Sequence, residues 1–235
     1  MNEKKVDKRP ETKVGTNLDY ASREAYNLLR TNISFAFPDE DGGKVVGVCS
    51  SRPQEGKSTT AINLAYSLAE AGNKVLLIDA DMRRPSVFET VGLPMEPGLS
   101  EILSGKGAHE VHKAVLHENL SVLTSGHIPP NPSELIGSNR MHALLEEFKA
   151  EYNYIIVDLP PVLAVSDPVA ISKYLGGIIL VVRHAKTRRR DIIESIRQLE
   201  YAGVKMLGFV YNRIGAKSAV KGKRKQYTYG EYVKD

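Results

Sequence analysis

The fold class of this chain is indicated most clearly by the stretch Ser51-Arg52-Pro53-Gln54-Glu55-Gly56-Lys57-Ser58. It follows the apolar run Val45–Cys49 and precedes a helical pattern that begins at Thr59. A strand, a tight loop ending in Gly-Lys-Ser and a helix together form a phosphate-binding loop. In such a loop the backbone N–H groups and the N-terminus of the helix point at one spot, which favours an anion. The stretch therefore predicts a nucleotide site; the alternative is an ordinary loop.

The residue types of this loop have separate expected roles. We expect Lys57 to reach the β- and γ-phosphates of the nucleotide and the Ser58 hydroxyl to bind Mg²⁺. Gly56 has no Cβ, so the backbone can approach a phosphate closely. Ser51 stands where the common form of the motif has Gly. The predicted nucleotide-binding residues of the loop are Ser51, Arg52, Pro53, Gln54, Glu55, Gly56, Lys57, Ser58 and Thr59.

Short apolar runs alternate with helical patterns along the chain. Buried strands are predicted at Val45–Cys49, Val75–Ile78, Leu120–Leu123, Tyr154–Val157, Ile178–Val182 and Met206–Tyr211. Helices are predicted at about Ser22–Phe35, and at Thr59–Ala71, Arg140–Tyr152, Asp167–Tyr174 and Arg189–Ala202. This alternation predicts an α/β fold with a mostly parallel, twisted sheet and helices on both faces. In such sheets ligands bind at the carboxyl ends of the strands.

Carboxylates follow two of the predicted strands. Asp79 and Asp81 end the strand at Val75–Ile78, and Asp158 ends the strand at Tyr154–Val157. Two acids at the mouth of a sheet are costly unless something cationic binds them. Bound Mg²⁺ would satisfy one of them, and a substrate hydroxyl would be the partner of the other. An acid after an apolar strand is also the usual Walker B arrangement, although the strand–Asp–turn pattern is common. For Arg83 we expect either a phosphate contact or a salt bridge to Asp81.

Two further features near strand or helix ends allow two interpretations each. Asn212 ends the last predicted strand, where its amide suits either the edge of an adenine ring or a turn. The run Lys186-Thr187-Arg188-Arg189-Arg190 begins a predicted helix. Cations there oppose the helix dipole, so they indicate either an acidic partner or, as the more common case, a solvated face.

Composition narrows the class of protein. The chain has 235 residues, of which 42% are hydrophobic and 26% charged, and its single cysteine cannot form an internal disulfide. No apolar run approaches the roughly 18 residues of a membrane span. The polar start lacks the apolar core of a signal peptide, so we expect a cytoplasmic protein. The net charge of +4 is balanced outside the last 22 residues, which argues against a nucleic-acid surface.

The last segment, 214–235, is basic and carries a tyrosine cluster, Tyr227, Tyr229 and Tyr232. It has too few aliphatic residues to bury these rings. Exposed tyrosines beside a nucleotide site suggest phosphate acceptors, whereas the alternative is aromatic contacts to the body of the domain. The basic residues themselves suit an acidic membrane surface or partner, or a solvated end.

From about Ser22 onward the chain resembles the bacterial tyrosine kinases of capsule and exopolysaccharide synthesis, in particular their stand-alone cytoplasmic CpsD/CapB type. The resemblance is carried by the phosphate loop, by the tyrosine cluster and by four further segments. These are Leu77-Ile78-Asp79-Ala80-Asp81-Met82-Arg83-Arg84-Pro85, Gly98-Leu99-Ser100, Gly126-His127-Ile128-Pro129-Pro130-Asn131-Pro132-Ser133-Glu134-Leu135 and Val157-Asp158-Leu159-Pro160-Pro161. The Pro-Pro-Asn-Pro-Ser-Glu-Leu segment is far more specific than any phosphate loop.

The resemblance implies a P-loop NTPase fold like that of MinD and ParA, with a Walker A, a Walker A′ and a Walker B motif. It implies that ATP and Mg²⁺ are bound, with Ser58, Asp79 and Asp158 at the metal. The implied catalytic residues are Lys57, Asp79, Asp81 and Arg83. We expect Asp79 to accept the proton of the attacking tyrosine, because free tyrosine has a pKa of about 10 and needs a base.

The resemblance also implies partners. A membrane-anchored polysaccharide co-polymerase adaptor activates such kinases at the inner face of the plasma membrane, and a cognate tyrosine phosphatase reverses their reaction. These kinases form homo-oligomeric rings in which the tyrosine tail of one subunit enters the active site of its neighbour. The ring motif, Glu-x-x-Arg-x-x-Arg in the family, reads Glu24 to Arg30 here with Asn27 at the middle position. Losing one charge-assisted contact there is worth roughly 1.5–3 kcal/mol if it is buried.

Two other departures concern the phosphate loop. Gln54 stands where the family usually has Gly, and Arg52 occupies the position of the signature lysine of the MinD-type relatives. A partitioning or positioning ATPase is therefore the main alternative, and a non-catalytic nucleotide-binding regulator of polysaccharide export is the second. We predict a disordered segment 1–17, a kinase domain 18–213 that includes the oligomerisation helix, and a flexible tail 214–235.

Overall fold

The structure is a computed structural model that describes residues 13–37, 42–106 and 111–214. Six strands of the described residues form one sheet in the order β3-β2-β4-β1-β5-β6, and every neighbouring pair is parallel. The strands are β1 (Lys44–Ser50), β2 (Val75–Asp79), β3 (Leu120–Leu123), β4 (Tyr154–Asp158), β5 (Gly177–Arg183) and β6 (Met206–Asn212). The predicted α/β fold and all six predicted strands are thus confirmed.

The register of the sheet brings the predicted acidic strand ends together. β4 lies between β2 and β1, and Asp79 of β2 pairs in register with Asp158 of β4. Asp158 also lies opposite Val48 of β1, two residues before that strand ends. Because all strands run the same way, the phosphate loop and both acidic ends meet at one edge of the sheet.

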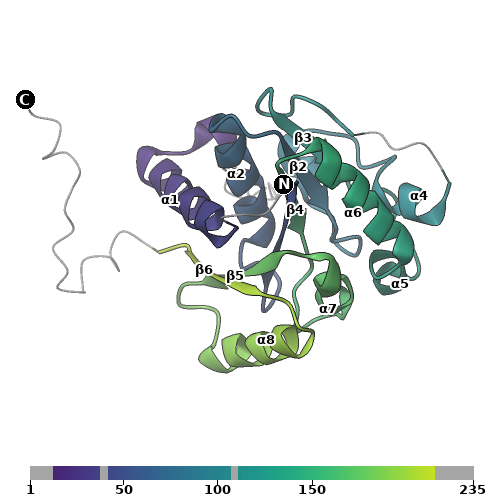
Figure 1. Cartoon of the computed structure of the whole chain (residues 1–235). Helices are drawn as coiled ribbons and strands as arrows, with labels where there is room; N and C mark the ends of the chain where they lie inside the picture. Colours follow the sequence, from purple (N-terminus) through teal and green to yellow (C-terminus); the bar gives the residue numbers. More distant parts are fainter. Residues whose placement is uncertain (1–12, 38–41, 107–110, 215–235) are drawn as a thin grey trace, which may run out of the picture.

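Helices cover both faces of the sheet (Figure 1). On one face lie α1 (Tyr20–Ala36) and α2 (Lys57–Glu70), and α2 is buried along most of its length between α1 and the sheet. The opposite face carries α4 (Leu99–Ser104), α5 (Pro132–Ile136), α6 (Asn139–Glu151), α7 (Asp167–Ile171) and α8 (Arg189–Tyr201). Sequence periodicity predicted the longer helices, but it missed α4, α5 and α3 (Val87–Val91), which are only five or six residues long. A 3-10 turn, η2 (Ser172–Tyr174), follows α7 where one continuous helix was predicted.

The N-terminal boundary differs from the predicted disordered segment 1–17. Residues 13–17 are ordered and include a 3-10 turn, η1 (Gly15–Asn17), whereas residues 1–12 lie outside the described residues. The backbone N–H of Gly15 donates to Asn63 Oδ1 on α2 at 3.0 Å, and Val14 is buried. These contacts with α2 hold the segment in place. The rest of the domain division stays a prediction.

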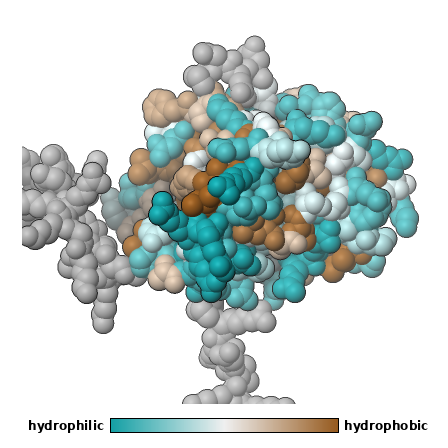
Figure 2. All heavy atoms as spheres, turned by 90° about the horizontal axis from the view of Figure 1, so that it is seen from below, coloured by the Kyte–Doolittle hydropathy of each residue, from teal (hydrophilic) through white to brown (hydrophobic). Residues whose placement is uncertain are grey.

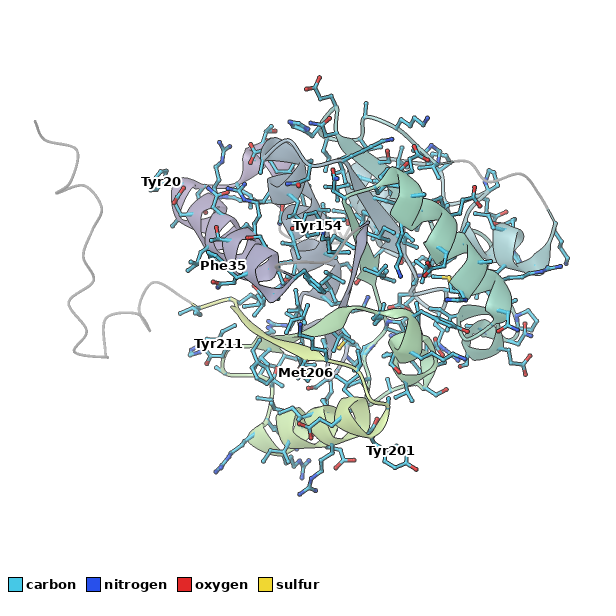
Figure 3. The ribbon with its side chains drawn as sticks, in the orientation of Figure 1. Tyr20, Phe35, Tyr154, Tyr201, Met206 and Tyr211 are labelled. Atoms are coloured by element: carbon cyan, nitrogen blue, oxygen red, sulfur yellow. The ribbon has the colours of Figure 1, made fainter. Side chains whose placement is uncertain are left out.

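The outer face of α1 is apolar at several positions. Tyr20, Leu28 and Phe35 are 68%, 63% and 76% exposed, and Figure 3 shows Tyr20 pointing away from the body of the molecule. Within the predicted ring motif, Arg30 donates to the carbonyl oxygen of Ser67 at 2.7 Å, and Asn27 donates to Glu24 at 3.1 Å. Arg30 is therefore partly engaged within its own chain.

Two other predicted features are the arginine run before α8 and the tyrosine cluster. Arg188, Arg189 and Arg190 at the start of α8 are exposed. Figure 2, which views the molecule from the side on which α8 lies in Figure 1, shows hydrophilic side chains gathered there. The acceptor tyrosines Tyr227, Tyr229 and Tyr232 lie outside the described residues. Within the part of the chain that the structure describes, no helix has the length and apolarity that a membrane span needs.

Candidate functional site

The loop between β1 and α2 depends on backbone conformations that favour glycine. Gly56 has a φ of 100°, and a Cβ added to it would lie 1.9 Å from Asn212 Nδ2. A side chain at this position therefore clashes with the end of β6. Gln54, which replaces the usual Gly, also has a left-handed φ of 64°. Such a conformation costs an L-residue about 1–2 kcal/mol, so the loop is held against strain by its surroundings.

Three residues of the predicted nucleotide loop also fix it, through their side chains, to α8 and to the residues before that helix. Their contact with nucleotide stays a prediction. Glu55 is buried and accepts hydrogen bonds from Arg52 N at 3.0 Å and from Thr187 Oγ1 at 2.6 Å. Arg52 forms two hydrogen bonds to Asp191, at 2.8 and 3.1 Å. Ser195 Oγ donates to Ser51 Oγ at 2.8 Å. The exposed arginines of the 186–190 run thus flank residues that support the site.

Lys57 and the predicted acids form one buried cluster at the edge of the sheet. Lys57 Nζ lies 2.9 Å from Asp81 Oδ2 and 3.4 Å from Asp158 Oδ2. It also donates to Ser58 Oγ at 3.1 Å. Asp79, Asp81 and Asp158 are at most 3% exposed. The cluster therefore sets three buried carboxylates against one ammonium group.

The pKa values follow from this arrangement. Burial, the nearby Asp158 and, less strongly, Asp81 raise the pKa of Asp79 to about 7, although Lys57 and backbone hydrogen bonds oppose the rise. Burial also raises the pKa of Asp158. For Lys57, burial works against the charge, but the surrounding carboxylates outweigh it and raise the pKa of the ammonium. The cluster holds more negative charge than Lys57 can neutralise, so it suits a further cation.

Asp79 and Asp81 have different surroundings. Asp79 accepts hydrogen bonds from the backbone N–H groups of Asp81, Ser86 and Val87, at 3.2, 3.2 and 3.1 Å. It thereby shapes the segment that follows β2. Ser86 Oγ in turn donates to Ser58 Oγ at 3.0 Å. Asp81 lies on the wall of the adjoining cleft, whereas Asp79 lies behind it.

The cleft beside the loop has a volume of about 980 Å³. It is lined by Pro53, Gln54, Gly56, Lys57, Ser58, Thr59, Asp81, Arg83, Arg84, Pro85, Ser86, Glu89, Thr90, Pro160, Pro161, Ala164, Val165, Arg183 and Arg213. Sequence reasoning missed Arg183 and Arg213 as wall residues, although both stand at the carboxyl ends of predicted strands. That position is the signal that would have found them.

Arg83 does not pair with Asp81, which was one of its two predicted roles. Its Nε lies 2.9 Å from Asp167 Oδ2 on α7, while Asp81 pairs with Lys57. Asn212 has both of its amide atoms engaged: Nδ2 donates to the carbonyl oxygen of Glu55 at 3.0 Å, and Oδ1 accepts from Arg213 N at 2.7 Å. Asn212 is the last residue of β6, and residues 213 and 214 are not in a turn, so its amide braces the phosphate loop from the end of that strand. Its contact with adenine stays a prediction.

The oxygen atoms of Ser58, Asp79 and Asp158 suit a Mg²⁺ ion that binds together with the nucleotide. Among the described residues, no group of three or more acidic, His or Cys side chains is arranged as a metal cage. Mg²⁺ does not need one, because it keeps several waters and binds through one or two carboxylates and substrate phosphates. Ser58, Asp79 and Asp158 provide such oxygen atoms beside the loop.

Comparisons with known proteins agree with this geometry. The family model of the AAA domain matches residues 43–184. The tyrosine-protein kinase YwqD of Bacillus subtilis is 42% identical over 80% of this chain and 80% of its own length. CpsD of Streptococcus agalactiae, also a tyrosine-protein kinase, is 35% identical over 91% of this chain and 90% of its own length. By contrast, this chain spans only 28% of the tyrosine-protein kinase ptk of Acinetobacter johnsonii, to which it is 38% identical.

Solved structures extend the likeness to the fold. The kinase domain of the Escherichia coli tyrosine kinase ETK superposes with a TM-score of 0.80 at 34% identity, covering 87% of this chain and 81% of that one. The chimerical protein CapA2B2 superposes with a TM-score of 0.76 at 38% identity, covering 81% of this chain and 84% of its own.

A substitution at Gly56 tests the packing of the loop. We expect Gly56→Ala to lower the free energy of unfolding by about 2–4 kcal/mol, because it combines a left-handed alanine with the clash against Asn212. Gly72→Ala is the matched control, since Gly72 has a φ of 84° and nothing within 4 Å of an added Cβ. Denaturant unfolding measures both variants. An equal loss in the two variants would show that Asn212 does not constrain the loop.

Lys57→Met tests the charge balance of the cluster. We expect a loss of about 3–5 kcal/mol at pH 8, because the carboxylates lose their buried counter-charge. Without Lys57 the folded-state pKa values of Asp79 and Asp158 rise further above their unfolded values. Stability therefore falls as pH rises from the unfolded values near 4 through the folded ones. The loss is therefore expected to be smaller at pH 5.5. Thermal unfolding at both pH values measures it.

Lys74→Met is the control for this experiment. Lys74 pairs with Glu151 at 3.1 Å, but both side chains are about half exposed. We expect a change of at most about 1 kcal/mol with no pH dependence. If the loss in Lys57→Met is the same at pH 5.5 and pH 8, the carboxylates are not held by Lys57 as described.

Proposed function

The chain belongs to the family of bacterial tyrosine-protein kinases, and from that premise we propose that it transfers the γ-phosphoryl group of ATP to tyrosines at its own C-terminus. The observation that carries the proposal is the buried cluster of Lys57, Asp81 and Asp158 at the phosphate loop. A lysine of this kind stabilises the charge on transferring phosphates, and a carboxylate on the cleft wall can accept a proton.

The roles of the two Walker A′ acids follow from their surroundings. Both oxygens of Asp79 accept backbone hydrogen bonds, whereas Asp81 lines the cleft with Lys57 as its partner. We therefore assign proton acceptance to Asp81 in place of Asp79, the residue expected from sequence. When Lys57 turns to the phosphates of ATP, Asp81 loses its cationic partner and becomes available to the tyrosine hydroxyl. Mg²⁺, held by Ser58, Asp79 and Asp158, would supply positive charge against the phosphate oxygens.

The acceptors are Tyr227, Tyr229 and Tyr232, reached in trans from a neighbouring subunit of a homo-oligomer. The exposed apolar side chains of α1 support such an assembly, because they leave a face that a second copy would cover. Glu24 and Arg30 belong to that helix and contribute to the contact. Each phosphate adds a charge of about −1.5 to −2, which opposes the basic residues of the tail. Phosphorylation would therefore release the tail and loosen the oligomer.

The kinase regulates the synthesis and export of capsular or extracellular polysaccharide. Its activator is a membrane-anchored co-polymerase adaptor of the CapA type, and a cognate tyrosine phosphatase removes the phosphates. Likeness to the chimerical protein CapA2B2 supports an adaptor of this type. The protein would then act in the cytoplasm, at the inner face of the plasma membrane.

Transfer between subunits is tested by mixing. Full-length Lys57→Met protein, made distinguishable by size and checked for folding by circular dichroism, is incubated with wild-type protein, ATP and Mg²⁺. We expect phosphotyrosine on the inactive chain, detected by mass spectrometry at the tail. A second inactive chain, Asp81→Asn, serves if Lys57→Met is too unstable. Inactive chains that stay unmodified beside modified wild-type chains would rule out transfer in trans.

Radiolabelled ATP separates the classes of function. The wild-type chain is incubated with γ-labelled ATP and Mg²⁺, with and without a cytoplasmic adaptor fragment. We expect label on protein tyrosine. Free phosphate without labelled protein would indicate an ATPase of the positioning class. Neither product, with nucleotide bound, would indicate a non-catalytic regulator.

A further inference from the structure

Ser133 and Asp167 hold the side chain of Arg83 in place. Both lie outside the phosphate loop and the acidic strand ends. Arg83 Nε and Nη2 donate to the two oxygens of Asp167, at 2.9 and 3.0 Å. Nη2 also donates to Ser133 Oγ at 2.9 Å. Ser133 Oγ in turn donates a short hydrogen bond to Asp167 Oδ1 and lies 3.2 Å from Ser166 Oγ. We call Arg83, Ser133 and Asp167 the arginine clamp.

Because Asp167 is buried, the clamp restricts Arg83 to one position. The side chain of Asp167 is 1% exposed, and that of Arg83 is 38% exposed. A buried carboxylate bound by both arms of a guanidinium group costs several kcal/mol to leave uncompensated. Arg83 therefore cannot swing away from α7 without orphaning Asp167. Its guanidinium is fixed at one place on the cleft wall.

Arg83 belongs both to the clamp and to the wall of the nucleotide cleft. Arg83 lines that cleft together with Lys57 and Asp81. Within the described ranges, its Nη1 makes no hydrogen bond, whereas Nε and Nη2 are both occupied by the clamp. The clamp thus leaves one guanidinium nitrogen for a ligand in the cleft.

Packing and a side-chain hydrogen bond fix the position of the segment that contains Ser133. Pro132, which begins α5, is buried, and Ile136 at the end of α5 is fully buried. Asn131 Nδ2 donates to Glu134 Oε2 at 2.6 Å across the first turn. α5 packs on α7, which begins at Asp167. The distinctive Pro-Pro-Asn-Pro-Ser-Glu-Leu segment therefore acquires a physical role, which is to support the clamp.

We propose that Ser133 and Asp167 are positioning residues, which hold Arg83 so that its free nitrogen contacts the phosphoryl group in transfer. This inference rests on the proposed kinase function. A fixed cation that meets charge developing in the transition state acts on kcat more than on KM. We therefore expect the clamp to affect turnover more than ATP affinity.

The test uses full-length Ser133→Ala and Asp167→Asn proteins, assayed at a temperature well below the unfolding transition of each. We expect kcat for tyrosine phosphorylation to fall about tenfold or more, with KM for ATP changed less than threefold. In an Arg83→Ala background, Asp167→Asn is expected to lower kcat no further, because it acts through Arg83. Ser133→Thr keeps the hydroxyl and is expected to restore most of the activity.

Unfolding provides a readout that does not depend on activity. Asp167→Asn is expected to lower the unfolding temperature in the wild-type background and to raise it in the Arg83→Ala background, where Asp167 lacks its cation. Ser138→Ala is the matched control, since Ser138 caps α6 by accepting from Met141 N at 3.3 Å and its hydroxyl donates to the carbonyl oxygen of Leu135, not to a clamp residue. It should lower the unfolding temperature and leave kcat unchanged.

The outcomes distinguish a failure of the clamp proposal from a failure of the kinase proposal. If the wild-type chain phosphorylates tyrosine and the clamp variants keep kcat within twofold while losing stability, the clamp is only structural and the proposal is wrong. Additive losses of kcat in the Arg83→Ala background would also overturn it. If the wild-type chain binds ATP but transfers no phosphate to tyrosine, the kinase proposal fails instead. The opposite unfolding shifts then report separately on whether the clamp exists.

Discussion

The structure depends on one imbalance of buried charge. Asp79, Asp81 and Asp158 lie within the sheet edge and its adjoining loop, and Lys57 is the cation that faces them. A buried carboxylate without a counter-charge is costly, so the cluster must either keep Lys57, take up protons or accept another cation. The pKa of Asp79, raised to about 7, reflects this choice. In the function proposed above, ligand binding would therefore exchange cations around these carboxylates.

The remainder of the fold serves to keep this cluster in place. The parallel register sets Asp79 beside Asp158, and α8 holds the phosphate loop through Asp191, Ser195 and the preceding Thr187. Such bracing explains how the loop tolerates a left-handed Gln54. It also explains why Gly56 must lack a side chain, since Asn212 occupies the space that a Cβ needs.

Much of this arrangement could be read from the sequence. Apolar runs predict all six strands to within about one residue at each end, because buried parallel strands have near-continuous hydrophobic sequences. Parallel topology then places Lys57, Asp79, Asp81 and Asp158 together. The sequence does not reveal which distant residues form ion pairs, because tertiary packing brings them together. Arg83 binds Asp167, 84 residues away, and Arg52 binds Asp191, 139 residues away. Short helices such as α5 escape periodicity for a different reason, since one turn gives no repeat to detect.

Because Lys57 alone does not balance the buried carboxylates, phosphates should bind beside them only together with a divalent cation. Calorimetric titration of ATP into the wild-type protein at pH 8, with and without Mg²⁺, tests this claim most directly. We expect saturable binding with Mg²⁺ and an affinity for ATP at least tenfold weaker without it, because unscreened carboxylates repel the phosphates. Equal affinity under the two conditions, or no binding by well-folded protein, would contradict it.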